Sequence, residues 1–306
     1  MTSFAKHAFA LLGSLWPLSA SALTQDDVKE AKSFMLNNSV YVLYHEIGHL
    51  FVGEFELPVL GKEEDAADNV ATLMLLAEDT DASAAALNDA ANGWYLSEYS
   101  DEATHYENAD FYDNHSLDIQ RSYAIVCLMV GSDAEKFGEI ADEFDLDKDR
   151  QEGCASDFAQ AVTSWDSLLA SSVRDGKAGK AIKVEYESGG DDYQEVANIL
   201  KGAKFLEQAA ALVTESYVLP RKITFTGKVC GEANAYYSPG SAEVIYCYEL
   251  ADYFYGLKVK DIAANEEGGD EEADDEEEVA VEEEDDEQAD EESPSASGIR
   301  GTLSTE

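Results

Sequence analysis

The sequence is poor in positive charge and lacks a long apolar run. It holds 20 Lys and Arg against 65 Asp and Glu in 306 residues, which gives a formal net charge of -45 at pH 7. Nucleic acids and anionic membranes are bound through Lys and Arg, so we expect no nucleic-acid partner. Beyond the N-terminal segment no apolar run approaches the roughly 18 residues of a membrane helix, so we also expect no stable membrane anchor.

Residues 1–22 have the pattern of a secretory signal peptide. Lys6 precedes an apolar segment at residues 8–18, and Ala20-Ser21-Ala22 supplies the small residues of a cleavage site. The apolar segment is too short to span a bilayer, and no cysteine follows that could carry a lipid. We therefore expect a mature chain that begins near Leu23 and is exported to a periplasm or secreted.

Cysteine is scarce, and no two cysteines have the C-x-x-C spacing of a zinc site. An even number in an exported chain predicts disulfides, although four cysteines permit three pairings. We favour Cys127 with Cys154 and Cys230 with Cys247, because each pair closes a short loop. Each bond would add roughly 3 kcal/mol in the loop-entropy account.

The C-terminal region has almost nothing apolar with which to form a core. Residues 266–292 are nearly all Asp and Glu, so burial cannot offset the entropy lost on ordering. We predict a disordered acidic tail at residues 263–306 and one folded domain at residues 23–262. A calcium-binding role for the tail is the alternative, but the EF-hand pattern is absent.

The folded region predicts an α+β domain, mainly helical with a small antiparallel sheet. Thr24 caps a first short helix, and Asn37-Asn38-Ser39 is expected to end it and to cap an apolar helix at residues 40–53. The periodicity predicts further helices at residues 62–76, 81–99, 117–130, 134–144, 156–172 and 193–216. It predicts strands at residues 181–186, 223–226, 233–237 and 244–247.

The most informative stretch is His45-Glu46-Ile47-Gly48-His49, within the apolar helix. Residues four apart share a helix face, so His45 and His49 can hold one Zn²⁺ ion while Glu46 lies beside it. A metal would also explain three strongly polar groups in a helix that is apolar on most sides. A hydrolytic zinc site has three protein ligands and one open position, so a further ligand must lie elsewhere.

The next predicted helix supplies a candidate in Glu64-Asp65-Ala66-Ala67-Asp68, which fits E-x-x-A-D. A carboxylate at the start of a second helix completes the site in two-helix zinc hydrolases, which makes Glu64 the predicted third ligand. Asp68 is then expected to accept the free ring N–H of His45 or His49. The alternative for Glu64 is an acid favoured by the dipole of the helix N-terminus.

Together these motifs resemble the metal-binding helices of gluzincins, the zinc peptidases related to the CAAX prenyl protease and the bacterial heat-shock membrane protease. The folded region is also similar to a bacterial family of exported metallopeptidases known as a domain of unknown function. The matching stretches are residues 57–61, 64–68, 115–121 and 230–250. The resemblance implies a zincin-like domain that uses zinc to hydrolyse a peptide or protein substrate, and we expect it to act as a monomer.

A further likeness concerns Asn234-Ala235-Tyr236-Tyr237-Ser238-Pro239-Gly240. It resembles the strand that precedes the H-E-x-x-H helix in the prenyl-protease relatives, although here it follows that helix by far. The resemblance implies an edge strand that borders the cleft and pairs with an extended peptide. The alternative is an ordinary hairpin closed by a disulfide.

The predicted reaction uses a zinc-bound water, with Glu46 as the general base. The developing oxyanion needs a second donor besides the metal, for which His115, Tyr236 and Tyr237 are candidates. Arg121 is a further candidate, but we expect it to pair with a nearby acid. Each of these residues could also be structural.

Two other functions fit part of the sequence. One is a catalytically inactive, metallopeptidase-like binding protein, against which the presence of Glu46 argues. The other is a scavenger of calcium or other metals that works through the acidic tail.

Overall fold

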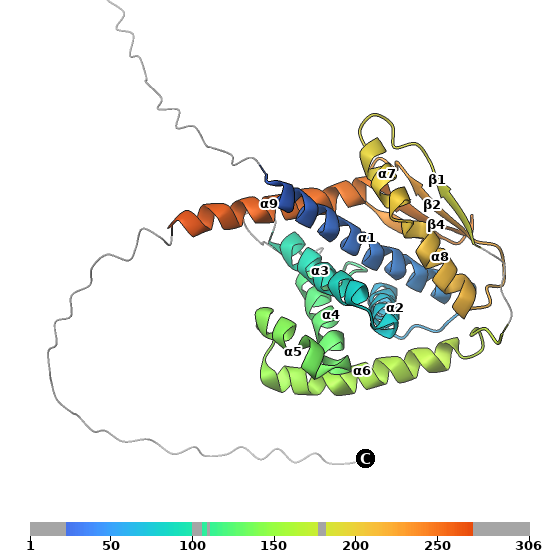
Figure 1. Cartoon of the computed structure of the whole chain (residues 1–306). Helices are drawn as coiled ribbons and strands as arrows, with labels where there is room; N and C mark the ends of the chain where they lie inside the picture. Colours follow the sequence, from blue (N-terminus) through green and yellow to red (C-terminus); the bar gives the residue numbers. More distant parts are fainter. Residues whose placement is uncertain (1–22, 100–105, 109–110, 177–181, 272–306) are drawn as a thin grey trace, which may run out of the picture. The chain divides into compact units, whose positions relative to one another are not determined.

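The computed structural model describes residues 23–99, 106–108, 111–176 and 182–271 (Figure 1). Residues up to Glu266 form one compact unit, and beyond them the structure describes only the end of the last helix. The elements in chain order are α1 (Gln25–Glu54), α2 (Glu63–Glu78), α3 (Asp81–Glu98), α4 (Asp118–Ser132), α5 (Ala134–Glu143), α6 (Lys148–Leu169), β1 (Lys183–Tyr186), α7 (Gln194–Gly202), α8 (Phe205–Ser216), β2 (Thr224–Lys228), β3 (Ala235–Ser238), β4 (Glu243–Cys247) and α9 (Tyr248–Glu271).

Two predicted segments lie at the ends of the chain. The signal peptide predicted at residues 1–22 lies outside the described residues, as do residues 272–306 of the predicted acidic tail. Helix α9 continues past Ile262, the predicted end of the folded domain, as far as Glu271.

Helix α1 is continuous for 30 residues, so the break predicted at residues 37–39 is wrong. The amide of Asn38 donates to the carbonyl oxygens of Phe34 and Asp89, both at 3.0 Å. The hydroxyl of Ser39 donates to the carbonyl of Met35 at 2.7 Å. Asn and Ser favour helix ends when their side chains compete for the backbone, but here they bond back onto the helix and across to α3. The helix therefore passes through them.

Two other helix predictions differ from the structure. Helix α6 begins at Lys148, well before the predicted residue 156. The helix predicted at residues 193–216 is divided into α7 and α8. Lys204 lies between them in the left-handed region, at φ 54°, which no helix interior accommodates.

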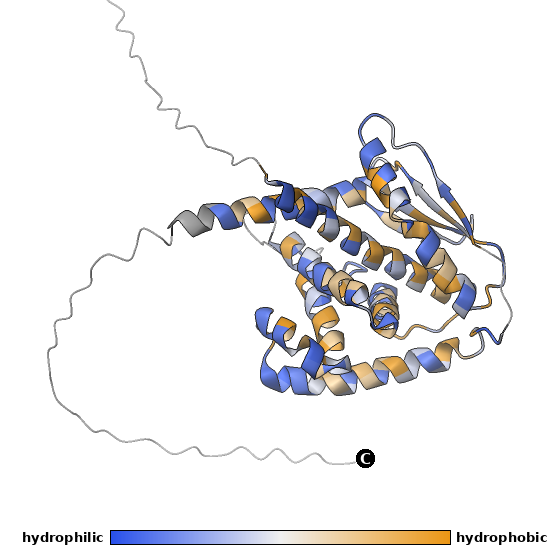
Figure 2. Cartoon of the chain, viewed as in Figure 1, coloured by the Kyte–Doolittle hydropathy of each residue, from blue (hydrophilic) through white to orange (hydrophobic). Residues whose placement is uncertain are grey.

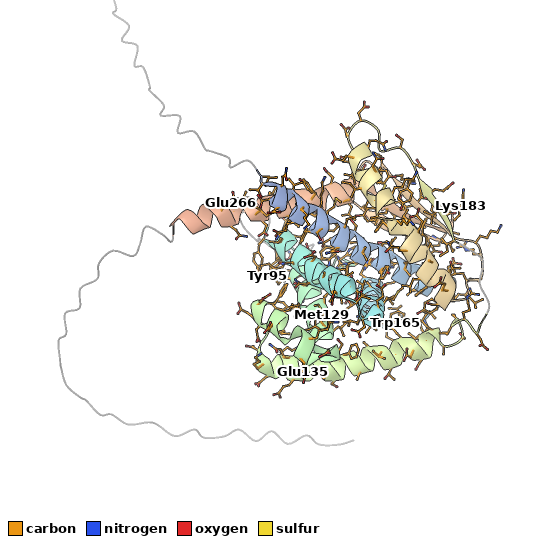
Figure 3. The ribbon with its side chains drawn as sticks, in the orientation of Figure 1. Tyr95, Met129, Glu135, Trp165, Lys183 and Glu266 are labelled. Carbon is orange, nitrogen blue, oxygen red and sulfur yellow. A yellow bond between two sulfur atoms is a disulfide. The ribbon has the colours of Figure 1, made fainter. Side chains whose placement is uncertain are left out.

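The main core surrounds α1, which packs against α2, α3, α8, β3 and β4. Figure 2 shows that the first turns of α1 are hydrophilic and that the rest is rich in apolar residues. Helix α4 adds Ile125, Val126 and Met129, all of them buried; Met129 is labelled in Figure 3. Burial on most sides of α1 is what brings its polar motif into the interior.

The sheet confirms the α+β class, but it is mixed rather than antiparallel throughout. Its strand order is β1-β2-β4-β3, with β1–β2 and β2–β4 parallel and only β3–β4 antiparallel. Parallel neighbours need a long crossover, and α7 and α8 supply one between β1 and β2. Strand β3 consequently lies at an edge, beside α1.

Both predicted disulfides are confirmed. Cys127–Cys154 joins α4 to α6, and Cys230–Cys247 joins the loop before β3 to the end of β4. Within the described ranges, no helix has the length and apolar character needed to cross a membrane.

Helices α1 and α2 approach each other most closely at Gly48. A Cβ atom added there would lie 2.7 Å from the Cα of Ala67 and 3.1 Å from its carbonyl oxygen. Both are backbone atoms, so a methyl group could be accommodated only if one helix moved. The glycine of the H-E-x-x-H motif thus sets the spacing between the two helices.

We expect Gly48→Ala to lower the free energy of unfolding by about 1–3 kcal/mol, because it overpacks the contact between α1 and α2. The matched control is Gly138→Ala in α5, where an added Cβ meets nothing within 4 Å. That change should be neutral or stabilising by up to about 1 kcal/mol, since Ala is the better helix former. Urea unfolding of both variants checks the prediction; equal stability of Gly48→Ala and the unchanged protein would contradict it.

Candidate metal centre

Three side chains from α1 and α2 converge on one point. The distances are 3.1 Å between His45 Nε2 and His49 Nε2, 3.2 Å between His45 Nε2 and Glu64 Oε2, and 3.1 Å between His49 Nε2 and Glu64 Oε2. A tetrahedral ion with bonds of about 2.0–2.1 Å separates its ligands by roughly 3.3 Å. The predicted ligands are therefore brought together at a spacing that fits one metal ion.

Asp68 lies behind this triad and fixes the orientation of His45. Its Oδ1 is 2.7 Å from His45 Nδ1, and Arg121 donates to both carboxylate oxygens at 2.8 Å. An N–H at Nδ1 that faces Asp68 leaves Nε2 free to bind a metal. The structure thus selects His45 rather than His49 as the partner of Asp68, and it pairs Arg121 with an acid as expected.

Arg121 itself is held between Trp94 and Asp68. It is buried, its guanidinium stacks 3.6 Å from the ring centroid of Trp94, and its two donors face Asp68. Burial opposes ionisation of Asp68, but Arg121 and His45 outweigh it and hold the pKa of the carboxyl well below its usual range. Burial likewise lowers the pKa of His45, and hydrogen bonds to Asp68 and Glu64 raise it to about 9.

His49 and Glu64 have partners that sequence reasoning missed. His49 Nδ1 lies 2.9 Å from Glu63 Oε1, so the acid next to the predicted ligand orients the second imidazole. His115 Nε2 lies 3.1 Å from Glu64 Oε2, and its Nδ1 lies 3.1 Å from Asp113. In the sequence, Glu63 is one of several acidic residues at the start of α2, and nothing distinguishes it from its neighbours as a partner of His49.

Glu46 is buried beside the triad. Burial raises the pKa of its carboxyl, against the opposing pull of His45, His49 and a hydrogen bond from the backbone N–H of Tyr237. A carboxylate whose pKa is raised accepts and returns a proton more readily near neutral pH. Glu46 thus combines burial, a raised pKa and a position beside the triad.

The cluster opens into a cleft of about 1150 Å³. Asn234, Ala235, Tyr236 and Tyr237 line it together with His45, as expected of a hairpin that borders the cleft. The other wall includes Trp94 from α3 and Leu250, Tyr253 and Phe254 from α9. No sequence signal pointed to α9, because its contribution follows only from the way the chain folds back.

Tyr237 is anchored away from the triad. Its hydroxyl donates to Glu54 at the end of α1, and Arg221 Nη2 donates to the same hydroxyl at 3.2 Å. Arg221 also donates to Glu54 through Nε at 2.9 Å and to the carbonyl of Pro239 at 2.6 Å. This Glu54–Arg221–Tyr237 network fastens the β3–β4 hairpin to α1. The hydroxyl of Tyr236, by contrast, has no hydrogen bond within the part of the chain that the structure describes.

Comparison with known proteins gave one family. A family model with the description "Putative metallopeptidase" matches residues 15–169 and 186–283. Neither the curated proteins nor the solved structures contained a match.

Asp68→Asn should lower the free energy of unfolding by about 3–5 kcal/mol, because it leaves the buried Arg121 without its counter-charge. It should also weaken metal binding by about 10- to 100-fold, since His45 loses its orienting acceptor. Urea unfolding and competition titration with a zinc chelator measure the two effects.

The matched control is Asp65→Asn on the same helix, where the carboxylate accepts only a hydroxyl hydrogen bond from Ser116 among the described contacts. Its cost should stay near about 1 kcal/mol with metal affinity unchanged. If Asp68→Asn behaved like this control, the bridging role of Asp68 would be refuted.

Proposed function

The chain belongs to the metallopeptidase family whose model covers most of its length, and from this premise we propose that it is an exported, zinc-dependent peptidase of the gluzincin type. The observation that carries the proposal is the meeting of two imidazoles and one carboxylate within 3.1–3.2 Å, with a buried carboxyl beside them. A purely structural metal site has no use for Glu46 in that position.

His45, His49 and Glu64 would hold the ion. Zinc bound there would lower the pKa of a water molecule to about 7 and polarise the carbonyl of the scissile bond. The chain's own part is to orient both imidazoles with Nε2 toward the ion, which Asp68 and Glu63 do by accepting the protons at the opposite ring nitrogens.

Glu46 is the proposed proton carrier. Its carboxylate takes a proton from the attacking water and returns it to the amine that leaves when the peptide bond breaks. The backbone N–H of Tyr237 holds the carboxylate from the side of the hairpin. The proposed base therefore lies next to the proposed substrate-binding strand.

An extended peptide is the substrate form that suits the cleft. The N–H of Cys247 donates to the carbonyl of Asn234 at 3.1 Å, so Asn234 turns its carbonyl toward β4. Backbone groups alternate along an antiparallel edge, and those of Ala235 and Tyr237 therefore face away from β4. A peptide can add to this edge as one more strand through the carbonyl groups.

For the oxyanion, the contacts favour two of the three candidates. The hydroxyl of Tyr237 is engaged by Glu54 and Arg221. Tyr236 and His115 line the cleft with donors that can turn toward a substrate. His115 is about half exposed and now contacts Glu64, a contact that raises its pKa.

Export is supported by two features. The N-terminal pattern is that of a secretory signal peptide, and the two disulfides form and persist in an oxidising compartment.

Glu46→Gln should abolish most turnover, by at least about 100-fold, while one zinc ion per chain is retained, because the base is not a ligand. His49→Ala should instead lose the metal. Cleavage of an unbiased peptide library and elemental analysis of each variant provide the measurements, with Glu56→Gln, an exposed residue just after α1, as the matched control. Equal cleavage by Glu46→Gln and the control would refute the proposed mechanism.

Tyr236→Phe should lower kcat by about 10²- to 10³-fold with little change in KM, as expected for loss of one oxyanion donor. Tyr237→Phe should change kcat far less, since it removes a hydroxyl that serves the Glu54–Arg221–Tyr237 network. The two variants are compared by steady-state kinetics on one peptide that the library identifies. Each variant lacks one hydroxyl oxygen relative to the unchanged protein. The reverse order of effects would assign the donor to Tyr237.

A further inference from the structure

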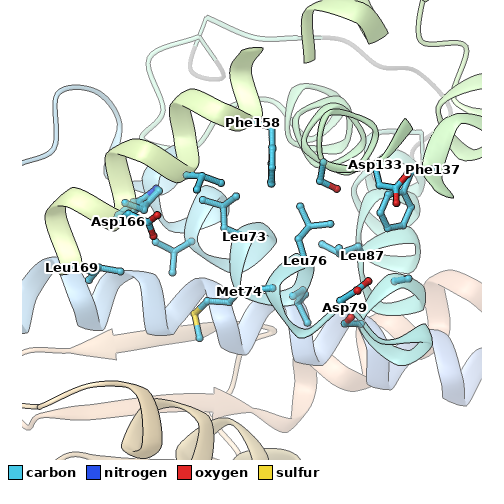
Figure 4. Close-up of a pocket in the computed structure, with 18 of the residues that line it drawn as sticks. Leu73, Met74, Leu76, Asp79, Leu87, Asp133, Phe137, Phe158, Asp166 and Leu169 are labelled. Atoms are coloured by element: carbon cyan, nitrogen blue, oxygen red, sulfur yellow. The ribbon is translucent and has the colours of Figure 1, made fainter. Parts of the chain in front are cut away.

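A second pocket, of about 570 Å³, lies between α2, α3, α5 and α6 (Figure 4). It shares no lining residue with the metal cleft. Helix α2 contributes to both, with its first turn at the cleft and its last turns at the pocket. The volume falls in the range of about 300–1,000 Å³ that is usual for small-molecule sites.

The walls of this pocket are apolar and incompletely covered. Leu73, Met74 and Leu76 of α2 are only half-buried, although they face the interior of the protein. Figure 4 shows Leu73 and Leu76 pointing into the space toward Phe158 of α6. Two helices that carried such side chains would ordinarily close together and bury them.

Helix α6 presents a matching face. Phe158, Val162 and Trp165 recur at helical spacing, line the pocket and are likewise half-buried. Most of its polar residues lie on the other side, which is exposed to solvent, and Asp166 lies at the edge of the apolar face. Helix α6 therefore has an apolar face that α2 only partly covers.

Covalent and backbone connections hold α6 at this distance. Near its start, the Cys127–Cys154 disulfide fastens α6 to α4. Just after its end, the N–H of Val218 donates to the carbonyl of Ser172 at 2.8 Å, and the N–H of Arg174 donates to the carbonyl of Ser216 at 2.9 Å. With both ends fixed, the helix is not free to move inward and fill the pocket.

The charged residues around the pocket are mostly acidic. Asp79, Asp133 and Asp166 line it against a single cation in its described lining, Lys136, which binds Asp79 at 2.9 Å. Asp133 accepts the backbone N–H groups of Glu135 and Lys136 at 3.0 Å, which partly offsets its charge. Burial and the nearby Asp166 raise the pKa of Tyr217 at the same end of the pocket. The rim therefore favours a cation over an anion.

We propose that this pocket binds a cationic amphiphile, a single alkyl chain of medium length with a quaternary ammonium or amine head group. The alkyl chain would cover the half-buried faces of α2 and α6, and the head group would lie at the acidic rim near Asp166. An anionic head group on an alkyl chain of the same length would be repelled by this acidic rim and by the protein's net charge of -45.

The test uses the full chain and decyltrimethylammonium below its micelle concentration, with binding followed by calorimetry and by tryptophan fluorescence. We expect saturable binding of one molecule and a change in emission that Trp165→Phe abolishes. Trp94→Phe is the matched control, because Trp94 lines the metal cleft instead, and the change should persist in it. An emission change that survives Trp165→Phe and disappears in Trp94→Phe would overturn the assignment.

Two further variants separate the pocket from general attraction to an acidic protein. Ala84→Phe, at a half-buried lining position of α3, should fill the pocket and abolish the saturable binding. Asp166→Lys, at an exposed rim position of α6, should keep the fold. It should weaken binding of decyltrimethylammonium relative to binding of decanol by about two- to fivefold, which is what one exposed charge pair contributes. Thermal unfolding of each variant checks that it is folded.

Binding that is unchanged in both variants would show surface adsorption and overturn the proposal. Tighter binding of decanoate than of decyltrimethylammonium to the unchanged protein would overturn the assigned head group.

Discussion

Helices α1 and α2 lie so close at Gly48 that a Cβ atom there would stand 2.7 Å from the Cα of Ala67. At this spacing, side chains that recur every four residues on one helix face side chains that recur every four residues on the other. His45 and His49 are four residues apart on α1, and Glu64 and Asp68 are four apart on α2. The donors that meet at the triad, and the acceptor behind it, therefore follow from one close contact between two helices. Farther along α2, Leu73, Met74 and Leu76 line the separate pocket instead.

Two arginines of this acidic chain hold α1, one of them through Asp68 and the other directly. Arg121 of α4 is buried against Asp68 and Trp94. Arg221 joins Glu54, at the end of α1, to the hairpin. The first pair is costly to bury and would destabilise the protein if either partner were lost, so it specifies geometry more than it adds stability. The second is half exposed and contributes less, but it determines where the edge strand lies relative to Glu46.

The sequence predicted those parts of this arrangement that depend on residues close together in the chain, and it missed those that depend on residues far apart. The facing residues of α1 and α2, the pairing of Asp68 with a histidine and both disulfides were predicted, because each rests on spacing within a helix or on short loops. The continuity of α1 through Asn38 was not, since it depends on the carbonyl of Asp89 on another helix. The parallel pairing of β2 with β4 and the contribution of α9 to the cleft likewise arise from contacts between distant segments. The break at Lys204 lies beside such a contact, the hydrogen bond from the N–H of Leu206 to the hydroxyl of Tyr186 at 3.0 Å. Periodicity carries no information about them.

The edge of β3 has a property that bears on the proposed substrate. Two residues have backbone groups that face away from β4. Ala235 gives its N–H to the side chain of Asn234 at 2.8 Å, and the N–H of Tyr237 faces the carboxylate of Glu46, whose pKa it lowers. The donors of this edge are therefore engaged, while its carbonyl groups face the cleft. A peptide that adds to β3 can therefore donate its N–H groups to these carbonyl groups but finds no free N–H groups for its own carbonyls. It would form fewer backbone hydrogen bonds with β3 than a neighbouring strand within a sheet does. In the proposed reaction, affinity would then depend on the side-chain contacts along the α3 and α9 walls of the cleft, and the strand would serve mainly to align the scissile bond with Glu46.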